Sequence, residues 1–552
     1  MRRKFGQAGG FLVGLLPNRA DLLAVGRSPG RDLVAGVTVA IVALPLALAF
    51  GVASGLGAQA GVTTAILAGA IAAVFGGSNL QVSGPTGAMT VVLITVVHQF
   101  GAGGVLQVGL MAGVILVLLA VSGVGRYVRY LPTSLVEGFT AGIAVVIALQ
   151  QVPNMLGLEP GKQDKVLALA ADAVARFASK PDPVPILIAL GVAAVILLGS
   201  RWKPSLPLSL LAVAIATGVG FFAQLGLPVV GQLPAAIPAP TLGFFKVELI
   251  TVLLPSAFAV AALAALESLL CATVADAMSV GQRHNPDREL LGQGLANLVV
   301  PLFGGVPATA AIARTAVNVR AGARSRLASL SHAAVLLVFV VVAAPVVGVI
   351  PLAALGGVLL ATTVQMVQVG AIRSILRSSR TDALVLIVTF VVTVVVDLVA
   401  AVVLGLALAG VLALRAVARS AQLERVPLEG TDHADEEQRL LDDHIVAFRL
   451  DGPLFFGAAH RFLLELTEVA DVAVVILRMS RVSTIDATGA LMLDDAITRL
   501  ERRGIVVLLS GIKPHHNRVL TGLGSAKRLR AAGRVFEDTP DAIGHARELR
   551  TT

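Results

Sequence analysis

Long uncharged apolar runs recur through the first three quarters of this chain and dominate its hydrophobic pattern. Examples are residues 37–56, 105–125, 207–222, 249–266 and 384–396. The hydrocarbon core of a bilayer is about 30 Å thick and takes roughly 20 such residues as a helix. One run of this kind could form a buried helix in a soluble protein, but a dozen cannot, so the pattern predicts a polytopic membrane protein.

The apolar runs predict about fourteen helices that cross or half-cross the membrane. Their approximate ranges are 33–52, 60–76, 86–100, 105–123, 134–151, 184–199, 207–226, 250–272, 289–303, 308–319, 329–347, 352–369, 382–398 and 400–416. The transmembrane domain is therefore predicted to cover residues 31–420, after a cytoplasmic N-terminal segment at residues 1–30.

The basic residues between these helices predict the orientation, because short cytoplasmic loops carry an excess of Lys and Arg. If the N-terminus is inside, alternate loops fall inside and hold most of the loop cations. These cations are Arg126, Arg129, Arg201, Lys203, Arg283, Arg288, Arg320, Arg324, Arg326, Arg373, Arg377, Arg380, Arg415 and Arg419. We therefore expect a multi-pass protein of the cell (inner) membrane, with its N-terminus and its C-terminal domain in the cytoplasm.

Two predicted segments differ from ordinary membrane helices because they are short and begin with Gly and Pro. One opens with Ser83-Gly84-Pro85-Thr86-Gly87, and the other with the stretch 304–309, GGVPAT. Each is third in a set of seven, which indicates an inverted repeat with a binding site near the middle of the membrane. The alternative is that Gly and Pro only kink two helices.

Helix N-termini carry partial positive charge and free N–H groups, so two N-termini that face each other would bind an anion without a buried cation. The predicted donors are the backbone N–H groups near Gly87, Ala88, Ala311, Ile312 and Ala313. The small residues among them would let an oxyanion approach the backbone.

Arg314 and Glu267 are charged residues within predicted membrane helices, where charge is expensive and usually functional. Arg314 is expected to add positive potential to the anion site; the alternative is a side chain that reaches the cytoplasmic interface. Glu267 predicts proton–anion symport, because a proton that neutralises it lowers the electrostatic barrier to anion entry. The alternative is a neutral Glu bonded to a backbone carbonyl. The ring of Phe50 either contacts the anion with its edge or simply packs.

The composition changes after residue 420. Residues 421–440 are predicted to be an acidic linker, and residues 441–552 a small α/β domain with alternating strands and helices. The strands are expected at 445–450, 472–477 and 505–509, and the helices at 457–469 and 487–503. Thr488, at a strand-to-helix junction, is a predicted phospho-acceptor; the alternative is an ordinary helix cap.

The amino-acid composition excludes several classes of protein. Hydrophobic residues make up 56% of the chain and charged residues 14%, against about 25% charged residues in soluble domains. The net charge of +9 comes from short loops without an aromatic or basic stripe, so nucleic acid is not an expected partner. The single cysteine, Cys271, excludes an intrachain disulfide framework. We expect no metal site and no cofactor apart from a proton as coupling ion.

Several stretches carry motifs that are specific when taken together. Residues 32–38 read DLVAGVT and lead to Pro45, residues 83–86 read SGPT, and residues 322–324 read GAR. Residues 289–318 contain EL, GQG, Asn297, FGG, PAT and RTAVN in that order. Over nearly its whole length the chain thus resembles the sulfate permease (SulP) family of anion transporters, which includes prestin, and its C-terminal region is similar to the STAS domain of that family.

The resemblance implies an all-α membrane domain of seven plus seven inverted helices, as in uracil permeases, followed by the α/β STAS domain. It implies a homodimer in which a core domain moves against a gate domain as an elevator. It also implies an anion site between the third and tenth helices. The matching positions are Phe50, Thr86, Gly87, Ala88, Ala313 and Arg314.

The resemblance also bears on coupling and regulation. Sodium-coupled bicarbonate members are similar but have Asp, Thr and Thr at the positions of Glu267, Cys271 and Ile312, whereas proton-coupled members have Glu at the first. Sodium prefers oxygen ligands, so the resemblance implies proton coupling. Thr488 matches the serine that is phosphorylated in bacterial anti-sigma-factor antagonists, although Ala487 departs from their Ser-Ser pair.

The sequence thus predicts a secondary active transporter, not an enzyme, that carries sulfate or a dicarboxylate such as fumarate in symport with protons. One alternative is a sodium-dependent bicarbonate transporter. Another is a signalling protein in which the membrane part only anchors the STAS domain, which would then bind a cytoplasmic protein partner.

Overall fold

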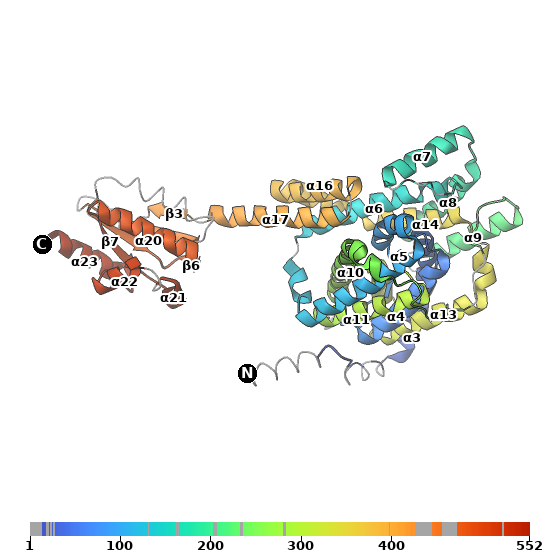
Figure 1. Ribbon diagram of the computed structural model, residues 1–552, viewed down its shortest axis with the longest axis horizontal. Helices are drawn as coiled ribbons and strands as arrows, with labels where there is room; N and C mark the ends of the chain where they lie inside the picture. The colour runs from blue at the N-terminus through green and yellow to red at the C-terminus, as the bar shows by residue number, and fades with distance from the viewer. Residues whose placement is uncertain are drawn as a thin grey trace. The chain divides into compact units, whose positions relative to one another are not determined.

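The computed structural model describes residues 14–17, 21, 25, 28–130, 132–159, 161, 163, 165–202, 207–231, 236–279, 283–396, 398–420, 422–425, 444–454, 472–520 and 524–551. Two compact units divide the chain, one at residues 1–406 and one at residues 407–552. Figure 1 shows that the first is built from helices and that the second combines helices with a sheet.

The helices of the first unit follow the apolar runs of the sequence. They are α3 (Pro29–Ala53), α4 (Ala58–Phe75), α5 (Gly87–Ser122), α6 (Thr133–Met155), α7 (Val166–Ser179), α8 (Pro183–Trp202), α9 (Leu208–Phe222), α10 (Ile250–Met278), α11 (Pro286–Val299), α12 (Ile312–Arg320), α13 (Leu327–Gly348), α14 (Leu352–Met366), α15 (Val369–Ser378), α16 (Arg380–Val395) and α17 (Leu398–Ser420). Helix α17 passes from the first unit into the second.

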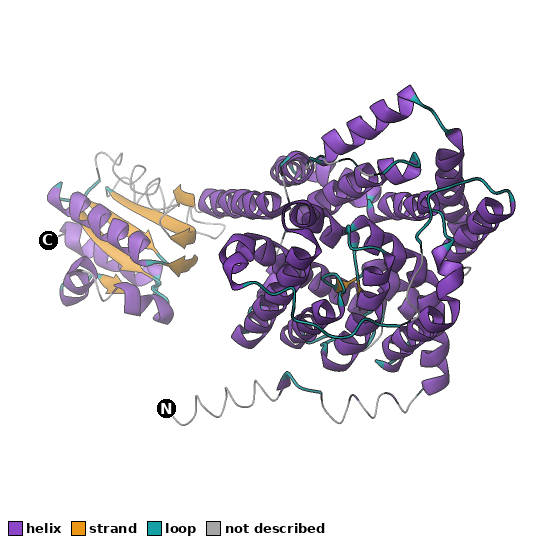
Figure 2. Ribbon diagram, turned by 45° about the vertical axis from the view of Figure 1, so that its right-hand side comes forward, coloured by secondary structure: helices purple, strands orange, loops and turns teal. Residues whose placement is uncertain are grey.

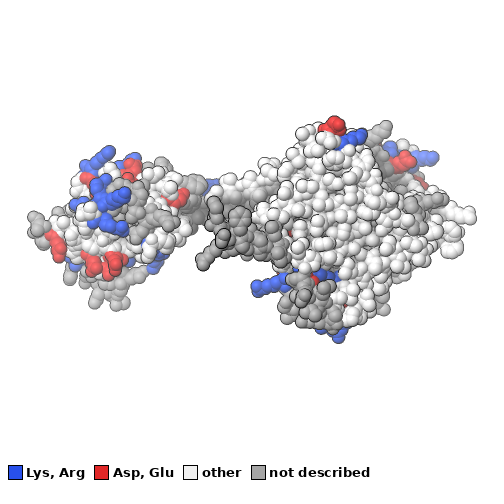
Figure 3. Space-filling view, turned by 60° about the horizontal axis from the view of Figure 1, so that its bottom comes forward, with Lys and Arg blue, Asp and Glu red and all other residues white. Residues whose placement is uncertain are grey.

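Every predicted membrane segment coincides with one of these helices or with half of one. Helix α5 accounts for two segments, because Gly101 breaks its regular backbone with φ 67° and ψ −171°. In the described part of the chain, eight helical stretches are long and apolar enough to cross a bilayer. The face of the helical unit in Figure 3 is almost free of charge, as contact with lipid requires. The chain is thus a multi-pass membrane protein.

Helices α7 and α15 were not predicted. Both are short and amphipathic, and none of the residues of α15 is buried. Neither lies in an apolar run of its own, because α7 contains Asp172 and Arg176 and α15 contains Arg373 and Arg377.

The helical unit consists of two bundles. The core bundle contains α3, α4, α5 and α10 to α13, and the gate bundle contains α6 to α9 and α14 to α17. The same helix contacts occur twice, once with each half of the sequence in the first role. Helix α3 packs on α13 in the way that α10 packs on α5. Helix α6 packs on α16 in the way that α14 packs on α8. This exchange confirms the predicted inverted repeat of seven plus seven segments.

Small residues let the helices of the core bundle approach closely. A Cβ on Gly61 of α4 would collide with the Ala47 carbonyl oxygen of α3 and with the backbone of Gly51. Membrane helices gain stability from such close contacts, because lipid provides no hydrophobic driving force between them. This packing gives the half-helices described below a rigid frame.

A buried carboxylate joins α3 to the beginning of α13. Asp32 is fully buried, and its Oδ1 accepts hydrogen bonds from the backbone N–H groups of Arg324 (2.7 Å) and Ser325 (3.2 Å). Its Oδ2 accepts a third from the Ser325 hydroxyl, at 2.6 Å. Bonds to a charged acceptor are strong, and donors left buried without a partner are costly.

Asp32→Ala is therefore expected to lower the free energy of unfolding by about 3 kcal/mol. Asp32→Asn keeps one acceptor oxygen, so its free energy of unfolding should fall by less than half of that amount. Thermal unfolding of the purified protein in detergent would measure both. Equal melting temperatures for Asp32→Ala and the unaltered protein would contradict this role.

The second unit is a sheet with helices on both faces. Its strands are β3 (Gln422–Arg425), β4 (Ile445–Leu454), β5 (Val474–Arg478), β6 (Val482–Ile485), β7 (Val506–Ser510) and β8 (Val535–Phe536). Its helices are α20 (Ala487–Arg502), α21 (Asn517–Leu520), α22 (Gly524–Ala531) and α23 (Thr539–Thr551). The strand order is β3-β4-β5-β7-β8, with β3 antiparallel and the others parallel, and β6 also pairs with β4.

Side chains that alternate along each strand point to opposite faces of this sheet. On β5, Val475 and Leu477 join the cluster that includes residues of α20, whereas Val474 and Ile476 join the cluster that includes residues of α23. The strands predicted at 445–450, 472–477 and 505–509 and the helix at 487–503 are confirmed. The helix predicted at 457–469 lies outside the described residues, and β3 falls within the range predicted as linker.

Candidate functional site

Two very short strands bring the broken helices together inside the core bundle. Strand β1 (Ser83–Gly84) pairs antiparallel with β2 (Thr309–Ala310), so that Ser83 is opposite Ala310 and Gly84 is opposite Thr309. The pair is visible in Figure 2 as the small sheet within the helical unit. Helix α5 begins three residues after β1, and α12 begins two residues after β2. The N-termini of the two helices therefore lie next to each other.

Buried polar side chains hold this strand pair. Ser268 of α10 shares a 2.8 Å hydrogen bond with the Thr309 hydroxyl and accepts one from the Ala310 N–H at 3.2 Å. Asn297 of α11 binds both the N–H and the carbonyl oxygen of Ala308, each at 2.8 Å, and Gln293 donates to the Ser83 hydroxyl at 2.7 Å. Non-helical backbone at membrane depth needs such partners. No role was predicted for these three side chains.

Arg314 lies in the first turn of α12 and is only 2% exposed. Its Nη2 donates to the carbonyl oxygen of Pro85, just before α5, at 2.8 Å. Its Nη1 is buried against Gly84 without a hydrogen-bond partner. The side chain is thus buried between the two helix N-termini, and its role at an anion site stays a prediction.

Glu267 of α10 reaches the N-terminus of α5. It is half-buried, and its Oε2 accepts a 2.9 Å hydrogen bond from the Thr86 hydroxyl. Thr86 is the residue immediately before α5 and is 6% exposed. Glu267 is therefore bonded to a side chain at the helix N-terminus, and its role in proton coupling stays a prediction. A carboxyl group and a guanidinium group thus flank the same pair of N-termini.

The two N-termini differ in accessibility. Gly87 and Ala88 are buried, and a Cβ on Gly87 would lie 3.1 Å from the ring of Phe50 and would collide with Ile147. At the other N-terminus Ala311 is half-buried, Ala313 is exposed and Ile312 is 44% exposed. Phe50 and Ile147 come from different bundles, so the site lies at the seam between them.

A separate apolar groove lies between α3, α4 and α13, lined by residues such as Leu44, Leu48 and Phe339. It includes none of the predicted site residues. The predicted site therefore depends on the helix N-termini and their side chains, not on this groove.

Two of the three positions that the resemblance links to sodium coupling, Cys271 and Ile312, carry no side-chain oxygen. The Cys271 thiol is fully buried and donates to the Thr315 hydroxyl at 3.1 Å. The side chain of Ile312 is an alkyl group at the open N-terminus. A thiol and an alkyl group are poor ligands for sodium, which prefers oxygen.

In the second unit, Thr488 is exposed in the first turn of α20. The cap of this helix is Asp486, whose Oδ1 accepts from the Gly489 N–H at 2.7 Å. The hydroxyl of Thr488 is thus not the cap, and its phosphorylation stays a prediction.

Comparison with known proteins places the chain in a family. The model of the Sulfate permease family matches residues 30–389, which is more than half of the chain, and the model of the STAS domain matches residues 440–542. The chain belongs to the sulfate permease family. This permease is similar to YvdB of Bacillus subtilis (33% identical, over 89% of this chain and 94% of YvdB). It is also similar to the bicarbonate transporter BicA of Synechocystis (32% identical, over 93% of this chain and 94% of BicA).

Solved structures agree with this fold. The transmembrane domain of a cyanobacterial BicA matches with a TM-score of 0.63 and 34% identity, over 68% of the permease and 97% of that chain. SLC26A9 matches with a TM-score of 0.83 over 99% of the permease and 94% of that chain; its identity of 17% supports the fold alone. The permease is therefore a membrane transporter and not an enzyme.

Proposed function

We propose that this permease is a secondary active transporter of small anions, and that the anion binds between the N-termini of α5 and α12. The observation that carries this proposal is the pairing of β1 with β2, because it sets two helix N-termini, Arg314 and Glu267 around one place. Sulfate or a dicarboxylate such as fumarate is the proposed substrate. Both are oxyanions that backbone N–H groups bind well.

Backbone donors would form the first part of the site. The first intrahelical hydrogen bonds are donated by Thr90 in α5 and by Thr315 in α12. The N–H groups of residues 87–89 and 312–314 therefore have no partner within their own helices. Phe50 would cover the anion, and the unpartnered Nη1 of Arg314 would add a charged donor.

Glu267 would couple the anion to a proton. An ionised carboxylate bonded to Thr86 places negative charge beside the N-terminus of α5 and repels an anion there. A proton on Glu267 removes this repulsion, so anion and proton bind together and cross the membrane together. The cycle is proton–anion symport.

The two bundles would provide alternating access. The site lies at the seam, where Phe50 of the core bundle and Ile147 of the gate bundle meet over Gly87. A displacement of the core bundle along the gate bundle would carry the site from one membrane face to the other, as in an elevator. A homodimer in the inner membrane, with the STAS domain in the cytoplasm for a protein partner, completes this proposal.

Sodium-dependent bicarbonate transport is the second candidate, and the similarity to BicA favours it. Against it stand the buried thiol of Cys271 and the alkyl side chain of Ile312, which offer sodium no oxygen.

Proteoliposome uptake separates the two candidates. We expect the purified permease to accumulate labelled sulfate or fumarate when the outside is acidic, without sodium on either side. Bicarbonate uptake that requires a sodium gradient, with no response to a proton gradient, would favour the second candidate. Liposomes without protein provide the control for anion leakage.

A further inference from the structure

Helix α15 occupies a place at the membrane surface that the transport mechanism leaves without a role. It connects α14 to α16, two helices of the gate bundle, after a break in the backbone at residues 367 and 368. Its 10 residues span about 15 Å, half of a bilayer core. Because it contains Arg373 and Arg377 and has no buried residue, it lies at the interface and not in the hydrocarbon.

The side chains of α15 divide into three adjacent faces. Ala371, Ile372 and Ile375 are half-buried on the side of the protein, where α15 contacts α6 and α16. Val369 and Leu376 form an apolar face that is 62% and 45% exposed.

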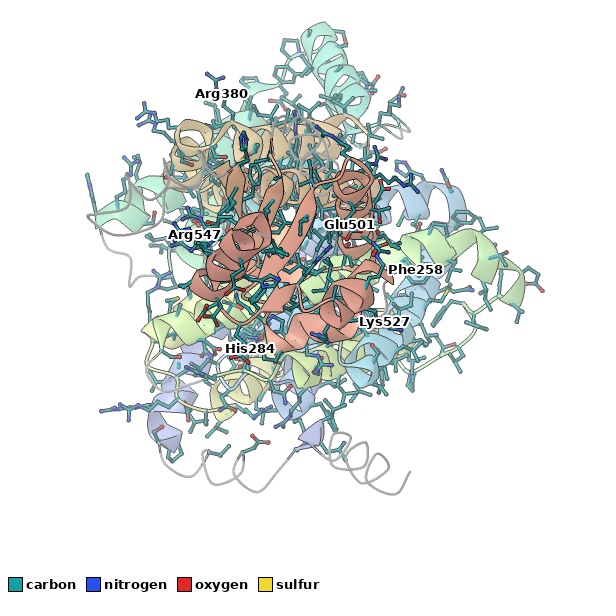
Figure 4. The ribbon with its side chains drawn as sticks, turned by 90° about the vertical axis from the view of Figure 1, so that its left-hand side faces the viewer. Phe258, His284, Arg380, Glu501, Lys527 and Arg547 are labelled. Carbon is teal, nitrogen blue, oxygen red and sulfur yellow. The ribbon has the colours of Figure 1, made fainter. Side chains whose placement is uncertain are left out.

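The third face carries the cations. An α-helix turns by about 100° per residue, so Arg373 and Arg377 lie about 40° and 80° around the helix axis from Val369. Both arginines are exposed, as is Arg380 two residues after the helix. Figure 4 shows that Arg380 projects outward from the ribbon.

No ion pair compensates these three arginines within the described ranges of the chain. The only acidic residue between positions 352 and 396 is Asp382, whose Oδ1 accepts from the Ser134 hydroxyl at 3.2 Å. The surface is thus positive beside an exposed apolar face. Arginine binds phosphate with two parallel N–H groups, and an apolar face next to it fits the acyl chains below a lipid headgroup.

We propose that α15 and Arg380 form a binding surface for anionic phospholipids, which anchors the gate bundle to the membrane surface. Arg373, Arg377 and Arg380 bind the headgroup phosphates, and Val369 and Leu376 insert beside the acyl chains. The apolar residues identify a lipid as the ligand, because a soluble phosphate ion would gain nothing from them. The inference does not depend on which anion is transported.

Native mass spectrometry of the purified full-length permease, titrated with phosphatidylglycerol or phosphatidylcholine, tests the proposal. A cation near an anionic lipid surface is worth roughly a five-fold change in binding, so the variant Arg373→Gln/Arg377→Gln/Arg380→Gln should weaken phosphatidylglycerol binding by more than ten-fold. Phosphatidylcholine binding should not change. If the triple variant does not fold, Arg377→Gln alone should give about a five-fold loss.

The matched control changes three other exposed arginines at the ends of membrane helices, Arg31, Arg201 and Arg415, to Gln. An equal loss in this control would overturn the proposal in favour of a general effect of net charge, as would unchanged binding in the first variant. Val369→Ser/Leu376→Ser should also weaken lipid binding. If that variant binds normally and millimolar inorganic phosphate displaces the lipid, the surface is a phosphate site and the proposal is wrong.

Discussion

Arg314→Gln is expected to raise the KM for anion uptake about 100-fold while the protein remains folded. A unit charge about 4 Å from an anion contributes on the order of 4 kcal/mol at an effective dielectric constant of about 20, and the glutamine amide recovers part of this as a hydrogen bond. Arg314 is 2% exposed and donates to the Pro85 carbonyl at 2.8 Å. Its loss therefore removes both charge and a contact between the two helix N-termini.

Uptake of labelled anion into proteoliposomes at a range of concentrations would measure this effect. Arg320→Gln is the matched control, because Arg320 is exposed at the other end of the same helix. Arg314→Lys keeps the charge but loses the planar geometry of the guanidinium group. Its KM should therefore lie between those of Arg314→Gln and Arg320→Gln. An Arg314→Gln variant with unchanged KM would show that the anion binds elsewhere.

Glu267→Gln is expected to abolish accumulation along a proton gradient and to spare anion binding. With one proton per anion, a gradient of one pH unit drives up to about ten-fold accumulation of the co-transported species. Gln retains an oxygen that accepts from the Thr86 hydroxyl, so the local structure should persist. Because Gln mimics the protonated acid permanently, the variant should equilibrate the anion to a ratio of about one without concentrating it.

The test compares the steady-state ratio of anion inside and outside, with and without an imposed pH gradient. Glu137→Gln is the control, since Glu137 is also an acidic residue in a membrane helix but belongs to the gate bundle. Accumulation by Glu267→Gln that matches the unaltered protein would refute the coupling role. Loss of binding, measured by substrate-induced thermal stabilisation, would instead assign Glu267 to the anion site itself.

The two charged site residues were visible in the sequence for a simple physical reason. Charge in an apolar helix is expensive, so Arg314 and Glu267 stand out from their surroundings. The two Gly- and Pro-containing stretches were equally visible, because neither continues a regular helix. Their position as third in each half also indicated that they belong to one site.

The side chains that hold the site were not visible in this way. Ser268, Gln293 and Asn297 are uncharged, and polar residues of this size occur in many membrane helices. Ile147 is one apolar residue among many in α6. Helices α7 and α15 were not predicted because each carries charged residues and neither forms an apolar run of its own.

The sequence by itself determined the membrane segments, the inverted repeat and the charged residues of the site, since each of these is a local pattern of polarity. Only the tertiary structure decided that Ser83 pairs with Ala310, that Arg314 donates to Pro85 and that Glu267 accepts from Thr86. These partners are far apart in the chain, and their contact depends on how two bundles of closely packed small residues fit together. Local periodicity does not contain that information, because packing is set by the shapes of all the helices at once.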